Sequence, residues 1–233
     1  MRTGKVVLVG AGPGDPELIT LKGIKYLQMA DVIVYDKLVS RELINYAKPS
    51  SIAILLSNDD TEVDLLRKYA LENKLVIRLK NGDPYIFGRG GKICQELIKD
   101  GIECEVVPGV SSVNSVPAYA GIPLTFNGIS DMITIVSAVS QGGKLFDFQK
   151  IPDYGTLVVL MGGKRLEEVS KGLMIKRDSS EDVAVIERGT YLDQKVYVNK
   201  LGKIAEIGNN LATPSMLVLG NVVRLREILW KFS

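Results

Sequence analysis

The sequence predicts an α/β protein with two α/β domains, the first built on a largely parallel sheet and the second on a mixed sheet. Strand-like and helix-like segments alternate through the first half of the chain. A stretch rich in Gly, Pro and Ser at 108–130 interrupts this alternation, and the apolar runs beyond it lie close enough together for antiparallel pairing. We expect the domains to span residues 1–118 and 119–233.

In the first half, each expected strand leads through a loop into an expected helix, which is typical of a parallel sheet covered on both faces. Ser40 is a plausible N-cap for a short helix over 40–47, and the helix near 62–73 places Val63, Leu66, Tyr69 and Ala70 on one face. The expected strands are 5–9, 31–35, 75–79 and 102–107, and the longer helices lie near 20–30, 62–73 and 91–100.

The second half has a different rhythm, because several apolar runs follow one another with only turns between them. Two helices are expected, near 163–172 and 201–207. The apolar runs are 132–137, 156–161, 182–187, 194–198, 215–219 and 221–226.

Composition excludes several classes of function. The net charge is +2 with both signs mixed along the chain, so neither a nucleic-acid surface nor a polybasic membrane anchor is expected. No apolar run reaches the roughly 18 residues that span a bilayer, and a cytoplasmic protein is therefore expected. The chain has no histidine, which excludes histidine-dependent nucleophiles and metal sites. Cys94 and Cys104 fit no zinc spacing and are expected to be buried thiols, and no metal is expected.

Two glycine-rich loops follow expected strands. The segment Arg78–Gly90 places the triplet Gly82-Asp83-Pro84 at the carboxyl end of a strand, where α/β proteins bind small ligands, although an ordinary turn would also explain it. The first loop has glycines at 10, 12 and 14, not at the spacing of a dinucleotide fingerprint. Asp15 would also repel a pyrophosphate, so an NAD-dependent oxidoreductase is the weakest alternative.

Taken together, these loops resemble the tetrapyrrole (corrin/porphyrin) methylase family, most closely its uroporphyrinogen-III C-methyltransferases. The resemblance extends from residue 6 to residue 226, with its blocks in family order. The blocks are Val9–Gly23, Tyr35–Ser40, Arg78–Gly90, Val107–Ser112, Ala118–Thr125, Met161-Gly162, Glu187–Thr190 and Val222–Arg226.

The resemblance implies a homodimer of two-domain subunits, with S-adenosylmethionine in a cleft between the domains and S-adenosylhomocysteine as product. It implies methylation of uroporphyrinogen III at C2 and C7 to precorrin-2, for sirohaem or cobalamin biosynthesis, with Asp36 as proton acceptor. A capping role for Asp36 at the helix over 40–47 is the alternative. The cofactor contacts that it implies are Pro13, Asn81, Gly82, Asp83, Ile86, Ser111, Ser112, Met161 and Gly189. Core packing would also explain Met161, and helix capping would explain the two serines.

A substrate with eight carboxylates needs basic side chains at the site, because the net charge of the chain is small. Arg89 is our main candidate for binding a substrate carboxylate, with an interdomain salt bridge as the alternative, and Arg41 is a second candidate. Lys37, Lys80 and Arg188 also lie in or beside the motif loops. The acidic group Asp59, Asp60, Glu62 and Asp64 is most simply a solvated loop and helix start.

The sequence departs from the family pattern on the substrate side. Asn58 stands where the family has a lysine assigned to proton donation, and Phe126 and Ser137-Ala138 replace segments that carry histidine. Asn81 replaces a glycine. Two alternatives therefore stay open: a methyltransferase acting on a later corrin-pathway tetrapyrrole, and a cofactor-binding protein with weakened catalysis.

Overall fold

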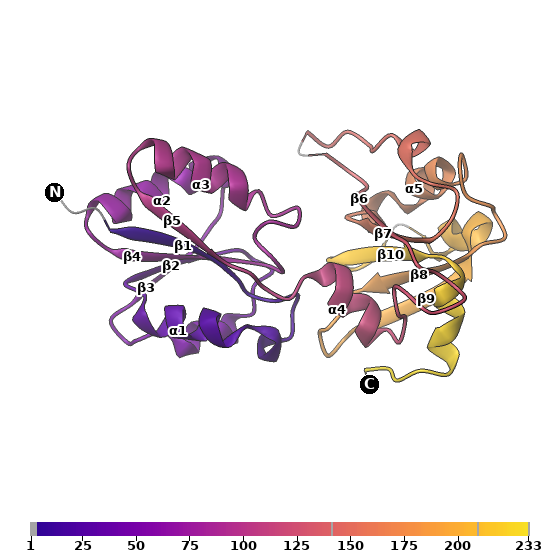
Figure 1. Ribbon diagram of the computed structural model, residues 1–233, viewed down its shortest axis with the longest axis horizontal. Coiled ribbons are helices and arrows are strands. Elements are labelled where there is room, and N and C mark those ends of the chain that lie inside the picture. Colours follow the sequence, from indigo (N-terminus) through magenta and orange to yellow (C-terminus); the bar gives the residue numbers. More distant parts are fainter. Residues whose placement is uncertain (1–3, 141, 209, 233) are drawn as a thin grey trace. The chain divides into compact units, whose positions relative to one another are not determined.

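The computed structural model describes residues 4–140, 142–208 and 210–232 (Figure 1). It divides into two compact units, the first ending at Ser112 and the second beginning at Val113. The expected boundary between 118 and 119 lies inside helix α4 (Ser112–Tyr119). Within the described residues, no helix is both long enough and apolar enough to cross a membrane.

The first unit is a five-stranded sheet in the order β3-β2-β4-β1-β5, in which every neighbouring pair is parallel. The expected parallel sheet is confirmed. Its strands are β1 (Lys5–Gly10), β2 (Val32–Tyr35), β3 (Ile52–Leu55), β4 (Leu75–Lys80) and β5 (Glu103–Val107). Its helices are α1 (Leu21–Met29), α2 (Glu62–Leu71) and α3 (Gly90–Lys99), with 3₁₀ helices at Pro16–Leu18, Arg41–Tyr46 and Asp59–Thr61.

The helices cover both faces of this sheet, with α2 and α3 on one face and α1 on the other (Figure 1). Alternation along β1 explains the two layers, because Val6 and Leu8 enter one core while Val7 and Val9 enter the other. Strand β3 was not expected from the sequence. Its four residues are all apolar, but it is a short edge strand, and Ile52 is half exposed.

The second unit is a five-stranded mixed sheet in the order β6-β7-β10-β8-β9, which confirms the expected mixed sheet. β6 and β7 are parallel, whereas β10 runs antiparallel to both β7 and β8, and β9 runs antiparallel to β8. The strands are β6 (Ile133–Ser137), β7 (Thr156–Leu160), β8 (Asp182–Glu187), β9 (Lys195–Lys200) and β10 (Ser215–Leu219). The helices are α4 (Ser112–Tyr119) and α5 (Leu166–Leu173), with 3₁₀ helices at Phe148–Lys150, Gly163–Arg165, Leu201–Ile207 and Asn221–Glu227.

The two cysteines form a disulfide, so the expectation of two buried thiols is wrong. Cys94 lies on α3 and Cys104 on β5, and their Cα atoms are 5.4 Å apart, within the range that a disulfide bridges. The chain reverses between them at Gly101, whose φ of +72° allows the tight turn from helix to strand. Sequence spacing alone does not show that this helix packs back against the following strand.

Reducing the disulfide is expected to lower the free energy of unfolding by about 2–3 kcal/mol, because the bond closes a short loop and restricts the unfolded chain. Urea unfolding with and without dithiothreitol measures this difference. The double variant Cys94→Ala/Cys104→Ala is the control and should be insensitive to the reductant. A wild-type midpoint that does not move on reduction would contradict the prediction.

Candidate functional site

Three glycine turns meet at the carboxyl edge of the first sheet. Gly10 ends β1, while Gly82 and Gly109 follow the neighbouring strands β4 and β5. A Cβ on Gly10 would lie 2.5 Å from the Cα of Gly109, and one on Gly109 would lie 2.4 Å from the carbonyl oxygen of Gly82. Only glycine permits this approach of three backbones. The first motif loop also bonds the second directly, since the Gly82 amide donates to the Gly12 carbonyl at 2.7 Å.

Asp83 holds these turns together through both of its carboxylate oxygens. Oδ2 accepts a hydrogen bond from the Gly109 amide at 3.0 Å, and Oδ1 accepts from the amides of Tyr85 and Ile86 at 2.7 and 3.2 Å. The carboxylate therefore joins the loop after β4 to the loop after β5. Its side chain thereby fixes the shape of the carboxyl edge of the sheet.

The other residues expected to contact a cofactor in this unit lie around the same turns. Gly82 has a φ of +66°, and a Cβ there would lie 3.6 Å from the Ser112 amide and 3.9 Å from the Cα of Ser111. Pro13 is buried, and Ile86 is 45% exposed on the loop that follows Asp83. Asn81 has an unusual environment, because its Oδ1 is buried and accepts no hydrogen bond from the described residues. A buried acceptor without a donor is costly, so this atom indicates a missing partner.

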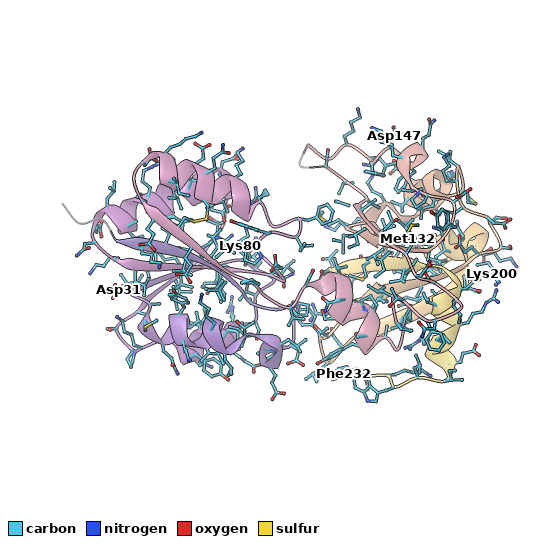
Figure 2. The ribbon with its side chains drawn as sticks, viewed as in Figure 1. Asp31, Lys80, Met132, Asp147, Lys200 and Phe232 are labelled. Carbon is cyan, nitrogen blue, oxygen red and sulfur yellow. A yellow bond between two sulfur atoms is a disulfide. The ribbon has the colours of Figure 1, made fainter. Side chains whose placement is uncertain are left out.

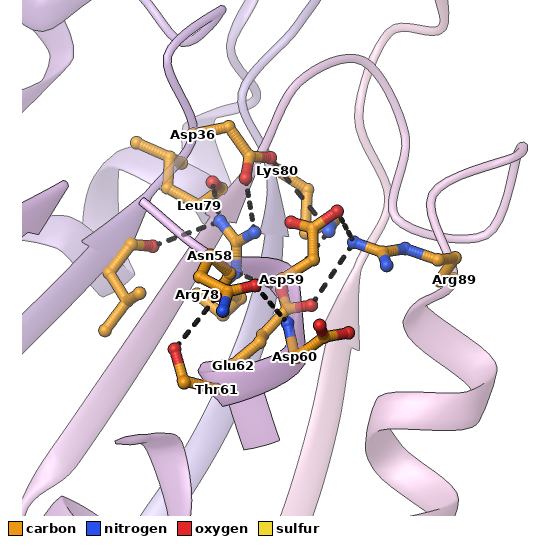
Figure 3. A network of polar contacts seen from close by, with 11 residues as sticks. Asp36, Asn58, Asp59, Asp60, Thr61, Glu62, Arg78, Leu79, Lys80 and Arg89 are labelled. Atoms are coloured by element: carbon orange, nitrogen blue, oxygen red, sulfur yellow. Dashed lines mark hydrogen bonds and ion pairs between the residues drawn. The ribbon is translucent and has the colours of Figure 1, made fainter. Parts of the chain in front are cut away.

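A network of charged side chains lies beside the turns, at the ends of β2 and β4 (Figure 3). Arg78 is wholly buried, and its Nε donates to Glu62 Oε1 at 2.5 Å while its Nη2 donates to Asp36 Oδ1. Lys80 Nζ lies 3.3 Å from Glu62 Oε1 and 4.0 Å from Asp36 Oδ2. Burial, and then the neighbouring Arg78 charge, lower the pKa of Lys80.

Asp36 is thus positioned by Arg78 and Lys80 and keeps about a quarter of its side chain exposed. The alternative capping role is not supported, because Ser40 occupies the N-cap position of the 3₁₀ helix Arg41–Tyr46 and the Asp36 carboxylate instead pairs with Arg78 and Lys80. Ser40 does occupy the expected N-cap position, but its side chain makes no capping hydrogen bond within the described chain. Lys80 lies at the carboxyl edge of the sheet, and Asp31 marks the opposite edge (Figure 2).

The acidic segment is not simply solvated, which corrects the sequence interpretation. Glu62 is only 3% exposed and faces the cations Arg78, Lys80 and Arg89. Arg89 Nη2 lies 2.7 Å from Asp59 Oδ2 and 3.6 Å from Glu62 Oε2, so its ion pairs are within its own unit. Asn58 accepts from the Asp60 amide at 3.0 Å and begins the 3₁₀ helix before α2.

A cavity of about 230 Å³ opens beside Asp36. Asp36 and Arg41, which we expected to have different roles, both line this cavity, together with Lys37. Its lining is Tyr35, Asp36, Lys37, Val39, Arg41 and Leu55. Within the described residues, no group of three acidic or sulfur-bearing side chains could hold a metal ion.

The site residues missed by sequence reasoning are Arg78 and Glu62. A signal for Arg78 was present, because it interrupts an otherwise apolar buried strand between Ile77 and Leu79. A charge in that position requires a buried partner. The sequence did not show which carboxylate supplies it.

Backbone strain marks the motif loops in both units. Among non-glycine residues of the described chain, six have positive φ, and all but Asn73 lie in motif loops. The five are Phe87, Arg89, Met161, Arg188 and Thr190. Such conformations cost energy and concentrate at functional sites.

In the second unit, Met161 follows β7 and is 51% exposed, so core packing does not explain it. Gly189 lies between two residues with positive φ, and a Cβ there would lie 2.2 Å from Val116 Cγ1. The Arg188 side chain bonds Asp193 at 2.6 Å and lies over the Tyr191 ring. Met161 therefore lies on a strained turn, and Gly189 lies on a closely packed turn between two strained residues.

Substituting Gly109 by alanine is expected to lower the free energy of unfolding by about 1–3 kcal/mol, because the new methyl group would force the packed turns apart. Gly91→Ala is the matched control, since a Cβ on Gly91 meets no described atom within 4 Å and alanine favours the helix α3. Urea unfolding of both variants measures the difference. A Gly109→Ala variant as stable as the control would show that the turns can move apart freely.

Comparison with known proteins identifies the family. Residues 5–205 match the model of the Tetrapyrrole (Corrin/Porphyrin) Methylases, and the chain belongs to this family. It is 44% identical to a uroporphyrinogen-III C-methyltransferase of Methanocaldococcus jannaschii, over 97% of this chain and 99% of the relative.

Two solved structures are similar over nearly the whole chain. One is a Thermus thermophilus uroporphyrin-III C-methyltransferase complexed with S-adenosylhomocysteine, with a TM-score of 0.85, 38% identity, and coverage of 95% of this chain and 100% of that one. A cobalt-precorrin-4 methyltransferase gives a TM-score of 0.84 and 28% identity, over 94% of this chain and 95% of the other.

Proposed function

We propose that this protein is an S-adenosylmethionine-dependent methyltransferase that methylates uroporphyrinogen III at C2 and C7, giving precorrin-2. The observation that carries the proposal is the joining of the Gly10, Gly82 and Gly109 turns at one sheet edge, in a chain similar over its length to an enzyme complexed with S-adenosylhomocysteine. Precorrin-2 would serve sirohaem or cobalamin biosynthesis. We further propose that the protein acts as a cytoplasmic homodimer.

The residues at the glycine turns fit the cofactor. The Asn81 amide oxygen needs a hydrogen-bond donor, and the cofactor carries several in its amino and hydroxyl groups. The residues that would hold it are Pro13, the Asn81-Gly82-Asp83 turn, Ile86, Ser111, Ser112, Met161 and Gly189. When bound, S-adenosylmethionine supplies an electrophilic methyl group on its sulfonium.

The chemistry requires alignment more than an activated nucleophile, because the pyrrole carbons of a porphyrinogen are electron-rich. Correct positioning of two reactants supplies about 7–11 kcal/mol of such a barrier. This demand agrees with a site without histidine, built from packed turns. Asp36 would accept the proton that leaves the macrocycle, held in place by Arg78 and Lys80.

The substrate's carboxylates require cations, and the cavity beside Asp36 offers Lys37 and Arg41. Arg89 would bind a further carboxylate at the neighbouring network. These assignments place substrate binding next to the proposed proton acceptor.

An anaerobic assay with methyl-labelled S-adenosylmethionine and freshly reduced uroporphyrinogen III tests the function. We expect two methyl equivalents per tetrapyrrole and the absorption spectrum of precorrin-2. Binding of S-adenosylhomocysteine without transfer would contradict the proposed substrate. It would then favour a later corrin-pathway tetrapyrrole, to which the likeness to the cobalt-precorrin-4 methyltransferase points, or a protein with weakened catalysis.

A further inference from the structure

Arg89 has two carboxylate partners that differ in how strongly they are held. Glu62 is 3% exposed and shared with Arg78 and Lys80, so it is a fixed part of the network. The Asp59 side chain is 58% exposed, on the 3₁₀ turn before α2, and it forms an ion pair with Arg89 at 2.7 Å. In Figure 3 the Arg89 guanidinium reaches from the start of α3 to both carboxylates. Asp59 is therefore the partner that can exchange.

The charges of this network balance. Among the described side chains in contact here, Asp36, Asp59 and Glu62 carry negative charge, and Arg78, Lys80 and Arg89 carry positive charge. Arg89 is thus neutralised before an anionic substrate arrives. An incoming carboxylate can form a bidentate contact with the Arg89 guanidinium only after the Asp59 carboxylate has moved away from it.

We propose that Asp59 is a specificity-determining residue that competes with a substrate carboxylate for Arg89. This inference rests on the proposed function, since it requires a polycarboxylate ligand. While Asp59 is paired with Arg89, the guanidinium is not available to the ligand. The apparent dissociation constant therefore rises as the fraction of molecules with an unpaired Arg89 falls. Exposed ion pairs are weak, so the dissociation constant rises by a factor of about two to five. The pair thus disfavours ligands whose carboxylate must bind Arg89, by the same factor for each, relative to ligands that do not use this guanidinium.

The test uses uroporphyrin III, the stable oxidised form of the proposed substrate, as a fluorescent probe of binding that does not depend on turnover. We expect Asp59→Asn to bind it about two- to five-fold more tightly than the wild type. Asp60→Asn is the matched control, because it removes one exposed negative charge from the next residue, which forms no ion pair within the described part of the chain. The control should change the affinity by less than about 1.5-fold.

A double-mutant cycle measures how much of the Asp59 effect on uroporphyrin binding acts through Arg89. In an Arg89→Gln background, Asp59→Asn should change uroporphyrin affinity no more than Asp60→Asn does, and S-adenosylhomocysteine affinity should be the same in all variants. Equal affinities of wild type and Asp59→Asn, or equal effects of the two Asp variants, would overturn the inference. A wild type that binds S-adenosylhomocysteine but no uroporphyrin would instead overturn the proposed substrate, so the two failures are distinguishable.

Discussion

Replacing Arg78 by methionine is expected to lower the free energy of unfolding by about 3–5 kcal/mol. The guanidinium is wholly buried and bonds Glu62, Asp36 and the Leu79 carbonyl, the last at 2.8 Å. Its loss would remove the closest cation of the buried Glu62, which would keep Lys80 at 3.3 Å and Arg89 at 3.6 Å as its partners. An uncompensated buried charge costs far more than the net worth of the pair. Urea unfolding followed by circular dichroism measures the change.

Two controls separate this effect from the general loss of an arginine. Arg67 bonds Asp64 and Asp100 at the surface of the same unit, and Arg67→Met should cost much less because water screens that pair. The double variant Arg78→Met/Glu62→Leu should recover part of the stability, since both charges are then gone. If Arg78→Met were no more destabilising than Arg67→Met, the network would not stabilise the fold.

The sheets could be predicted from the sequence because each strand carries its own apolar period. The face Val63, Leu66, Tyr69 and Ala70, expected for one helix, packs into the core of the first unit. The edge strand β3 is the exception, because its apolar run of four residues has no alternation and is too short to distinguish a strand from a loop. The apolar run at 221–226 forms a 3₁₀ helix that buries Val222, Val223 and Leu225. The sequence therefore predicted that these side chains are buried, but not the backbone conformation of the segment.

The turns of the site were predictable, and the ion pairs were not. Gly10, Gly82 and Gly109 each follow a strand-like segment, and parallel strands bring such ends to one edge. The pairing of Asp36, Glu62 and Arg78 depends instead on β2 and β4 being neighbours and on the direction of α2. The Cys94–Cys104 bond depends in the same way on packing between elements. Sequence reasoning therefore found the loops and misjudged the acidic segment.

Substituting Asp36 by asparagine is expected to lower kcat for methyl transfer by about 10²–10⁴-fold, because the amide cannot accept the proton that leaves the macrocycle. Asparagine has the same shape and keeps an oxygen that can accept from Arg78, so the fold should be retained. The Gly10, Gly82 and Gly109 turns, where we propose the cofactor binds, do not use this carboxylate, so the affinity for S-adenosylhomocysteine should change less than about two-fold. Steady-state methyl transfer to uroporphyrinogen III and calorimetric titration with S-adenosylhomocysteine measure the two quantities.

Comparing the effect of Asp36→Asn on kcat with its effect on KM distinguishes two roles for Asp36. A proton acceptor affects the chemical step, so kcat should fall while KM for the porphyrinogen changes little. A carboxylate that only orients Arg78 or Lys80 would instead alter the basic surface facing the substrate, and KM would change. Asp36→Glu should restore part of kcat, because it returns a base at a slightly displaced position. A kcat within about three-fold of wild type in Asp36→Asn would exclude the proton-accepting role and leave Asp36 as a partner of Arg78 alone.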